Sequence, residues 1–229
     1  MLTRPFPSRF AEDARAVGAV EFAVALPFAL FLMLGGYETA NYVRVSLRLE
    51  MAANSIAEMI SQTPASASAT VASNGLVTNQ QIHFFYDSTM YTLPDSLTEA
   101  AQQGVNWQDI TTVSYWSVEF KPNSANCGAT CTYSPVVVWS FNGGPPCGAQ
   151  IQESADDAVV TPLTLPASVY GPGSVLVVQV SYKYYPTFGA SWFGATTLTR
   201  TAMMAPRNVN VVESNDTADH AANCPNTPF

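Results

Sequence analysis

The chain has 229 residues, of which 48% are apolar and only 11% are charged, and its formal net charge is −8. This length fits one domain plus an anchor better than two full domains. From Met51 onward four cations stand against twelve carboxylates, a net charge of −8, which disfavours nucleic acid or anionic lipid as a partner of this region.

A basic leader at residues 1–16 is followed by an apolar segment from Ala19 to Tyr37, in which Glu21 is the single charged residue. A helix of this length covers about 28 Å, close to the ~30 Å hydrocarbon thickness of a bilayer. The segment therefore predicts a transmembrane helix over about residues 19–40, with the lipid bilayer as its partner. Pro27 removes one amide from this helix, so we expect a kink or a free carbonyl there and a partner helix that satisfies it.

A cleaved secretory signal is the main alternative for this segment, because a basic start and an apolar core describe both kinds of sequence. Glu21 and Pro27 interrupt the apolar core, and the residues that follow it, GGYETAN at 35–41, offer no A-x-A cleavage site. We therefore expect the anchor to be retained. The arginines on either side, three before the segment and two after it, orient the anchor only weakly.

All four cysteines, Cys127, Cys131, Cys147 and Cys224, lie after the apolar segment. An even number on one side favours disulfides in an oxidising compartment, with four buried thiols as the alternative, and three pairings are open. Disulfides would place the C-terminal side outside the cytoplasm, so the N-terminus is predicted to be cytoplasmic. The two histidines do not lie at zinc-finger spacing from these cysteines, and we expect no metal site.

The helix is predicted to continue to about residue 62, because residues 38–62 contain no Gly or Pro and their apolar residues recur at steps of three and four. Thr63-Pro64 ends it, since the residue before proline is pushed out of helical geometry. From residue 17 this helix would be about 65 Å long, so its second half must pack on the chain's own sheet or on neighbouring subunits. The apolar positions are Tyr42, Val45, Leu49, Ala52, Ile56 and Met59.

Residues 63–207 are predicted to form an α+β domain with an antiparallel sheet. A small, polar, flexible connection at residues 64–75 precedes a short helix near Asn79–Tyr91, which a capping box at Thr78 and Gln81 begins. Residues 208–229 are predicted to be a polar tail, loose except where Cys224 ties it down. Alternating patterns and turn residues predict strands at Thr111–Phe120, Pro135–Phe141, Ser174–Tyr185 (a half-buried strand) and Thr196–Met204.

No motif in the sequence carries catalytic chemistry, since G-x-S-x-G, H-E-x-x-H and Walker loops are missing from it. His83 and Asp87 on the predicted short helix, and the neighbours Asp156 and Asp157, fit exposed solvated pairs better than acid/base pairs. An acidic tail explains the polar group at residues 216–220 better than a cation site does. We therefore expect no enzyme activity, no cofactor and no small-molecule substrate.

The run from Arg15 to Glu38, RAVGAVEFAVALPFALFLMLGGYE, resembles the N-terminal signature of the TadE/TadG-like proteins of bacterial tight-adherence (Flp) pilus assembly. The shared features are a basic leader, Gly-x-x-Glu-Phe, an internal Pro and a closing Gly-Tyr-Glu. Because members are similar to type IV pilins here, the resemblance implies a pilin-like fold, one long transmembrane and periplasmic helix before an antiparallel sheet. It also implies prepilin peptidase cleavage between Ala16 and Val17, which would make Glu21 the fifth mature residue; Ala16 stands where the family carries glycine, so cleavage is left open.

The resemblance implies a membrane-anchored minor pilin or pseudopilin of the bacterial inner membrane, with its sheet domain in the periplasm. The implied partners are other pilins or pseudopilins and the inner-membrane pilus assembly platform, and entry into the fibre is left open. The alternative is a single-pass anchored periplasmic binding domain unrelated to pili, in which the tryptophans and tyrosines of the strands bind glycans.

Overall fold

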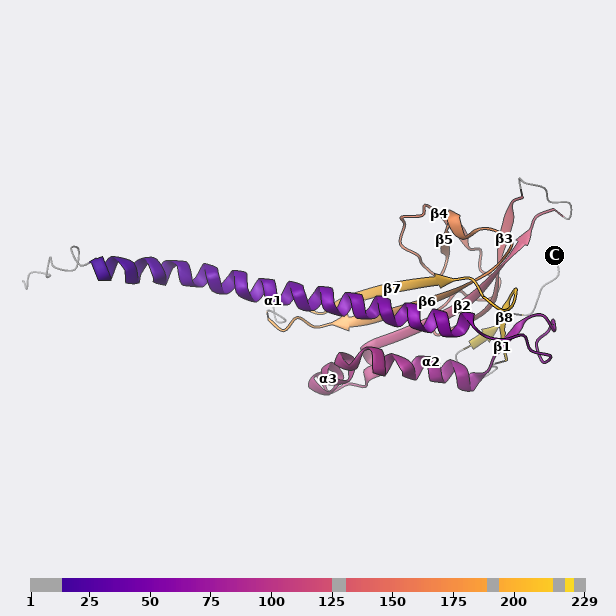
Figure 1. Cartoon of the computed structure of the whole chain (residues 1–229), viewed down its shortest axis with the longest axis horizontal. Helices are drawn as coiled ribbons and strands as arrows, with labels where there is room; N and C mark the ends of the chain where they lie inside the picture. Colours follow the sequence, from indigo (N-terminus) through magenta and orange to yellow (C-terminus); the bar gives the residue numbers. More distant parts are fainter. Residues whose placement is uncertain (1–13, 125–130, 189–193, 216–220, 225–229) are drawn as a thin grey trace, which may run out of the picture. The chain divides into compact units, whose positions relative to one another are not determined.

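The computed structural model describes residues 14–124, 131–188, 194–215 and 221–224 (Figure 1). The contacts of the chain divide it into two compact units, residues up to Arg44 together with Pro186–Gly194, and Val45–Tyr185 together with the residues from Ala195 onward. The fold is α+β, with a long apolar N-terminal helix and an antiparallel sheet, as the sequence predicts.

The four predicted strands correspond to β2, β3, β6 and β7, and the predicted short helix corresponds to α2. The helices are α1 (Ala14–Ser61), α2 (Asn79–Thr92) and α3 (Pro94–Gln103), with 3-10 turns η2 (Trp107–Asp109) and η3 (Ala167–Val169). The strands are β1 (Gly75–Val77), β2 (Thr111–Pro122), β3 (Tyr133–Phe141), β4 (Gln152–Ser154), β5 (Thr164–Pro166), β6 (Gly173–Tyr184), β7 (Thr196–Met204), β8 (Val212–Ser214) and β9 (Ala221–Asn223).

Helix α1 is one continuous α-helix of 48 residues, and Pro27 lies inside it without ending it. At its C-terminus the backbone amide and the hydroxyl of Thr63 both donate to the carbonyl of Ile60, at 3.1 and 2.7 Å. These two bonds satisfy a carbonyl that the last turn of a helix leaves without an amide. The helix therefore ends at Ser61, as the Thr63-Pro64 signal predicts.

The main sheet has five strands in the order β7-β6-β2-β3-β9, and each neighbouring pair in it is antiparallel. Strand β2 is central: its residues from Thr111 to Phe120 pair with β6, and those from Tyr115 to Pro122 pair with β3. The register with β3 shifts between Ser117 and Val118, a bulge of the kind that increases the local twist of a strand. From Tyr115 to Phe120, β2 therefore has a neighbouring strand on each side.

One face of this sheet packs against the second half of α1 together with α2 and α3 (Figure 1). The apolar residues of α1 at steps of three and four meet alternate residues of β6, as both patterns predict. Met59 packs at the edge of this core, whereas Tyr42 is exposed. The buried residues from α1 are Val45, Leu49, Ala52, Ala53, Ile56, Ala57 and Ile60, and those from β6 are Leu176, Val178, Val180, Tyr182 and Tyr184.

Two ion pairs join the second half of α1 to other parts of the domain. Arg48 Nη1 donates to Asp95 Oδ2 of α3 at 2.5 Å, and Arg207 Nη2 donates to Glu58 Oε2 at 2.7 Å. All four side chains are partly exposed, so each pair contributes only about 0–1 kcal/mol to stability. The buried apolar stripe therefore determines which face of the helix packs on the sheet, and the ion pairs add little to it.

The opposite face of the sheet carries a second apolar cluster, which the chain between β3 and β6 covers (Figure 1). Trp116 of β2 and Val177 of β6 meet Ile151 and Leu165 of this cover, in which β4 and β5 pair in parallel. The prediction that Ser174–Tyr185 is a half-buried strand is therefore wrong for its first half. Residues 174–178 of β6 are buried on both faces because the cover lies over them.

Three other segments differ from their predictions. Helix α3 is not among the predicted elements. The connection at residues 64–75, predicted to be flexible, is held by a hydrogen bond from Ser66 N to Asn74 O at 2.9 Å. The prediction of a loose tail is wrong for Val211 to Ser214, which are buried, because β8 pairs in parallel with β1. The domain therefore extends beyond its predicted boundary at residue 207.

Glu213 of β8 is a buried carboxylate that organises this connection. Its Oε1 accepts from Asn74 Nδ2 at 2.7 Å, and its Oε2 accepts from the backbone amide of Thr70 at 2.7 Å. Burial raises the pKa of the Glu213 carboxyl, but the hydrogen bonds from Asn74 and Thr70 outweigh burial and leave the pKa below its ordinary value. The ionised carboxylate is therefore the form that the folded chain prefers.

Glu213→Gln is expected to lower the free energy of unfolding by about 2 kcal/mol at neutral pH, because the amide places an N–H against donors that the carboxylate satisfied. A lowered pKa gives stability that is present above the pKa of an unfolded glutamate, about 4.3, and is lost as the pH falls through the folded value. Urea unfolding should thus show that the difference in free energy of unfolding between wild type and variant is smaller at pH 3 than at pH 7. The exposed Glu153→Gln is the matched control, and a Glu213→Gln difference that is equal at both pH values would contradict this account.

Candidate membrane-spanning segment

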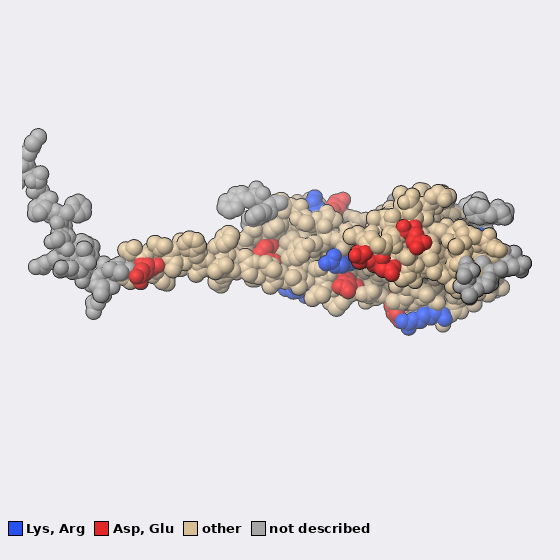
Figure 2. Space-filling model, turned by 90° about the horizontal axis from the view of Figure 1, so that it is seen from above, with Lys and Arg blue, Asp and Glu red and all other residues tan. Residues whose placement is uncertain are grey.

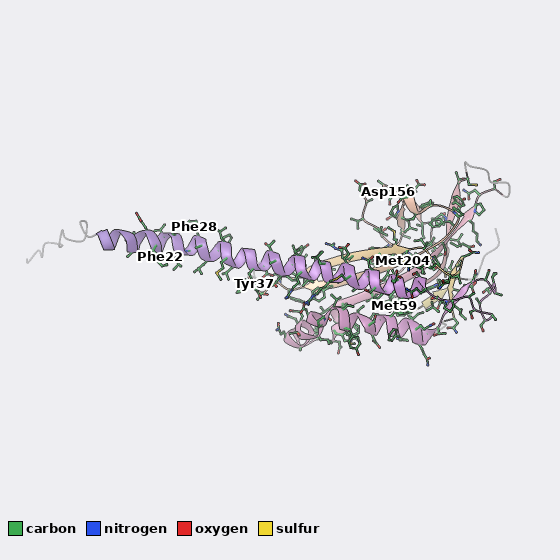
Figure 3. All side chains as sticks on the ribbon, in the orientation of Figure 1. Phe22, Phe28, Tyr37, Met59, Asp156 and Met204 are labelled. Carbon is green, nitrogen blue, oxygen red and sulfur yellow. A yellow bond between two sulfur atoms is a disulfide. The ribbon has the colours of Figure 1, made fainter. Side chains whose placement is uncertain are left out.

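The first half of α1 exposes a continuous apolar surface (Figure 3). Figure 3 shows its side chains, Phe22 and Phe28 among them, extending outward from the helix, and Phe31 is 78% exposed. Monomeric soluble proteins rarely expose so large an apolar surface, which marks a membrane or protein contact. The exposed large apolar residues here are Val20, Phe22, Val24, Leu26, Phe28, Leu30, Phe31, Leu32, Met33, Leu34 and Tyr37.

Among the described residues, α1 is the helix that is long and apolar enough to cross a membrane, and none of its most apolar window is buried inside the chain. This exposure distinguishes it from the core helix of a soluble protein, which can be equally apolar but is buried inside the chain. The twenty residues from Gly18 to Tyr37 span about 30 Å, the thickness of the hydrocarbon layer. On its visible face this part of α1 carries a single acidic group near its start (Figure 2).

The implied processing site, the acidic residue and the proline of this segment all lie within α1. Ala16 and Val17, the implied processing site, are inside α1, and Glu21 lies one turn further on and is exposed. Pro27 has no amide, so the carbonyl of Ala23, four residues earlier, has no helical donor. Glu21 and this carbonyl are two polar groups that need hydrogen-bond or ionic partners if the segment enters lipid.

A turn from elsewhere in the chain contacts α1 where the apolar segment ends. The rings of Tyr37 and Phe188 pack edge to face with centroids 5.8 Å apart. The carboxylate of Glu38 accepts from the backbone amides of Thr187, at 3.1 and 3.3 Å, and of Phe188, at 3.3 Å. The sequence gives no signal for this contact, because about 150 residues separate its two sides.

Cys147 and Cys224 form a disulfide, with their Cα atoms 5.1 Å apart. Cys131 is also disulfide-bonded, and Cys127 lies outside the described residues. The prediction of disulfides rather than free thiols is thus confirmed for Cys147 and Cys224, and the structure selects their pairing from those that the sequence left open.

The residues considered for acid/base or metal chemistry do not form a site in the part of the chain that the structure describes. His83 and Asp87 are exposed on α2. Asp156 accepts from the backbone amide of Ser168 in η3 at 2.8 Å, and the hydrogen bonds from this amide and from the Ser168 side chain lower the pKa of Asp156. Asp157 is exposed.

No cluster of three or more His, Cys, Asp or Glu that could hold a metal ion occurs among the described residues. Asp216, Asp219 and His220, the polar group considered in the C-terminal tail, lie outside them.

Five of the strand tryptophans and tyrosines that a glycan-binding surface would need are buried. Trp116 and Trp139 have no exposed surface, and Tyr115, Tyr182 and Tyr184 are buried as well. Glycan binding by aromatic side chains requires exposed ring faces, so these five residues belong to the core and do not form a platform.

No family model, no curated protein and no solved structure matches this chain. The function is therefore argued from the chain's own residues.

Proposed function

We propose that the chain is a membrane-anchored minor pilin or pseudopilin that acts in the assembly of a tight-adherence (Flp, type IV-like) pilus at the bacterial inner membrane. The observation that carries this proposal is the exposed apolar first half of α1, which runs without a break into a buried half that holds the sheet. Such a helix supplies a bilayer anchor and a surface for other helices. The resemblance of residues 15–38 to TadE/TadG-like proteins supports the same function.

The proposed mechanism is helix packing in the membrane. A carboxylate at the bilayer centre costs ~2.5–3.5 kcal/mol on insertion scales, and the cost falls toward the interface, where Glu21 would lie. A basic group on a neighbouring subunit, such as a free N-terminal amine, would pair with Glu21. A donor on the same neighbour would satisfy the carbonyl of Ala23. Sister pilins or pseudopilins and the assembly platform are the partners of this kind that the resemblance implies.

The disulfide supports a periplasmic position for the sheet domain. Disulfides form and persist in the bacterial periplasm and are rare in the cytosol. Since Cys147 and Cys224 both follow the apolar segment, the N-terminus is proposed to be cytoplasmic. The alternative, an anchored glycan-binding domain, has no specific observation in its favour, because both strand tryptophans, Trp116 and Trp139, and three strand tyrosines are buried.

Phe28→Arg is expected to weaken membrane insertion by about 3 kcal/mol, or roughly a hundredfold, because an arginine replaces an apolar side chain near the bilayer centre. The measurement is the fraction of chain that resists carbonate extraction from membranes. Phe84→Arg is the matched control, since Phe84 lies on α2 and is 62% exposed, compared with 70% for Phe28. Equal extraction of both variants would contradict the anchor.

Two further measurements on the same strains separate the anchor from the pilus role. Mass spectrometry of the mature protein should find an intact N-terminus or one at Val17, whereas a start near Asn41 would indicate a cleaved signal. Cells that lack the chain should assemble no pili, and Phe84→Arg should restore assembly while Phe28→Arg does not. Normal pili without the chain would contradict the pilus role and leave the anchor standing.

A further inference from the structure

The turn that follows β6 reaches α1 at the residue where the apolar segment ends. Strand β6 ends at Tyr184, and Thr187 and Phe188 then lie against Tyr37 and Glu38. Nothing in the proposed pilin role requires this contact. It places an apolar side chain from a distant part of the sequence beside the last residue of the proposed span.

The position of Tyr37 along α1 sets the depth of this turn. Because the twenty residues from Gly18 to Tyr37 match the hydrocarbon thickness of about 30 Å, Tyr37 lies at the boundary between the hydrocarbon and the headgroups. Tyrosine is enriched at this level, where its apolar ring and polar hydroxyl each find a suitable environment. The ring of Phe188, 5.8 Å from that of Tyr37, must lie at nearly the same depth.

The Glu38 carboxylate holds the turn at this level. It accepts backbone amides from two successive residues, Thr187 and Phe188, at 3.1 to 3.3 Å. These bonds satisfy two amides of the turn within the chain, so the turn can lie next to the hydrocarbon layer, inside which unsatisfied backbone groups are costly. Phe188 is still 44% exposed after its contact with Tyr37, so a face of the ring is left for lipid.

We infer that the turn at residues 186–188 is a second contact with the membrane, in which Phe188 inserts among the lipid headgroups beside Tyr37 and Glu38 is the positioning residue. The inference rests on the proposed membrane-spanning role of residues 18–37. The bilayer is the occupant that this position favours, because the turn adjoins the end of the span, and the contact continues the same apolar surface.

Depth measurements on full-length protein in phosphatidylcholine vesicles test this inference. Phe188→Cys carries an environment-sensitive fluorophore, and quenching by lipids with a spin label near the headgroup is compared with quenching by lipids labelled near the chain end. Phe28→Cys reports the bilayer core, and Val159→Cys, at a position 83% exposed, reports water. The Phe188 probe should be quenched several-fold more by the headgroup label than the Val159 probe, and Glu38→Ala should remove most of that difference while the Phe28 probe is unchanged.

Three other results of this experiment would contradict the inference or the span on which it rests. A Phe188 probe no more quenched than the Val159 probe, with the Phe28 probe in lipid, would overturn the inference and keep the anchor. If the Phe28 probe is not quenched either, the proposed span itself fails. Quenching of the Phe188 probe that falls as protein is added to the vesicles would show that a second copy covers the ring, which also overturns the inference.

Discussion

Trp139→Ala is expected to lower the free energy of unfolding by about 5 kcal/mol, the sum of a large cavity and a lost hydrogen bond. Trp139 of β3 has no exposed surface and lies in the core beneath α1. Its Nε1 donates to the carbonyl of Val212 at 2.9 Å, which ties β8 to the main sheet. The variant therefore removes apolar packing and leaves a buried carbonyl without its donor.

Two further variants separate these contributions in urea unfolding followed by far-ultraviolet circular dichroism. Trp139→Phe keeps most of the ring volume but not the donor, and should cost about 2 kcal/mol. Trp107→Ala is the control: Trp107 is only half-buried and packs on Tyr86 with ring centroids 5.0 Å apart, so its loss should cost about 1–2 kcal/mol. Similar costs for Trp139→Ala and Trp107→Ala would contradict the assigned role of Trp139.

The elements that could be predicted from the sequence are those whose signals are local. The capping box of α2 needs only Thr78 and Gln81, and both of its bonds form, Gln81 N to Thr78 Oγ1 at 3.4 Å and Thr78 N to Gln81 Oε1 at 2.9 Å. The continuous helix α1 and the alternation of β6 likewise follow from patterns within one segment. Helix α3 has comparable local signals, Pro94 in its first turn and Gly104 in a left-handed conformation after its end, although the predicted elements do not include it.

The elements that could not be predicted depend on partners far away in the sequence. Strand β8 has three residues, too few for a periodic pattern, and it forms because β1 pairs with it and Trp139 donates to it. The burial of Glu213 follows from the same pairing, since it brings Asn74 and Thr70 to its carboxylate. The polar composition of residues 208–229 therefore predicts a loose tail, whereas contacts with distant residues make residues 212–214 a buried strand.

The same distinction holds for the candidate site. The apolar segment, Glu21 and Pro27 are visible in one stretch of sequence, and length alone relates them to a bilayer. The contact of Tyr37 and Glu38 with Phe188 is not visible there, because a single phenylalanine in a turn carries no pattern. Only the fold brings these residues to one level of α1.

Replacing both cysteines of the Cys147–Cys224 disulfide with serine is expected to lower the free energy of unfolding by about 4 kcal/mol. The bridge joins positions 77 residues apart, and chain-entropy arguments give about 4.5 kcal/mol for a loop of that size, within a measured range of 2–5. Cys224 follows β9, which pairs with β3 over three residues only, so the bridge adds a covalent restraint to the described residues 221–224. The urea midpoint and hydrogen exchange at residues 221–224 measure the effect.

The two single variants show whether the loss of the cross-link itself causes this decrease in the free energy of unfolding. Cys147 is exposed, so Cys147→Ser loses little packing, yet it breaks the bridge as completely as Cys224→Ser does. Each single variant should therefore cost nearly as much as the double variant, a strong departure from additivity. A small cost for Cys147→Ser beside a large cost for Cys224→Ser would instead assign the stability to the packing of Cys224 against the second core cluster. If the cross-link is responsible, the domain reaches its full stability only where disulfides persist, which is the compartment that the proposed orientation gives it.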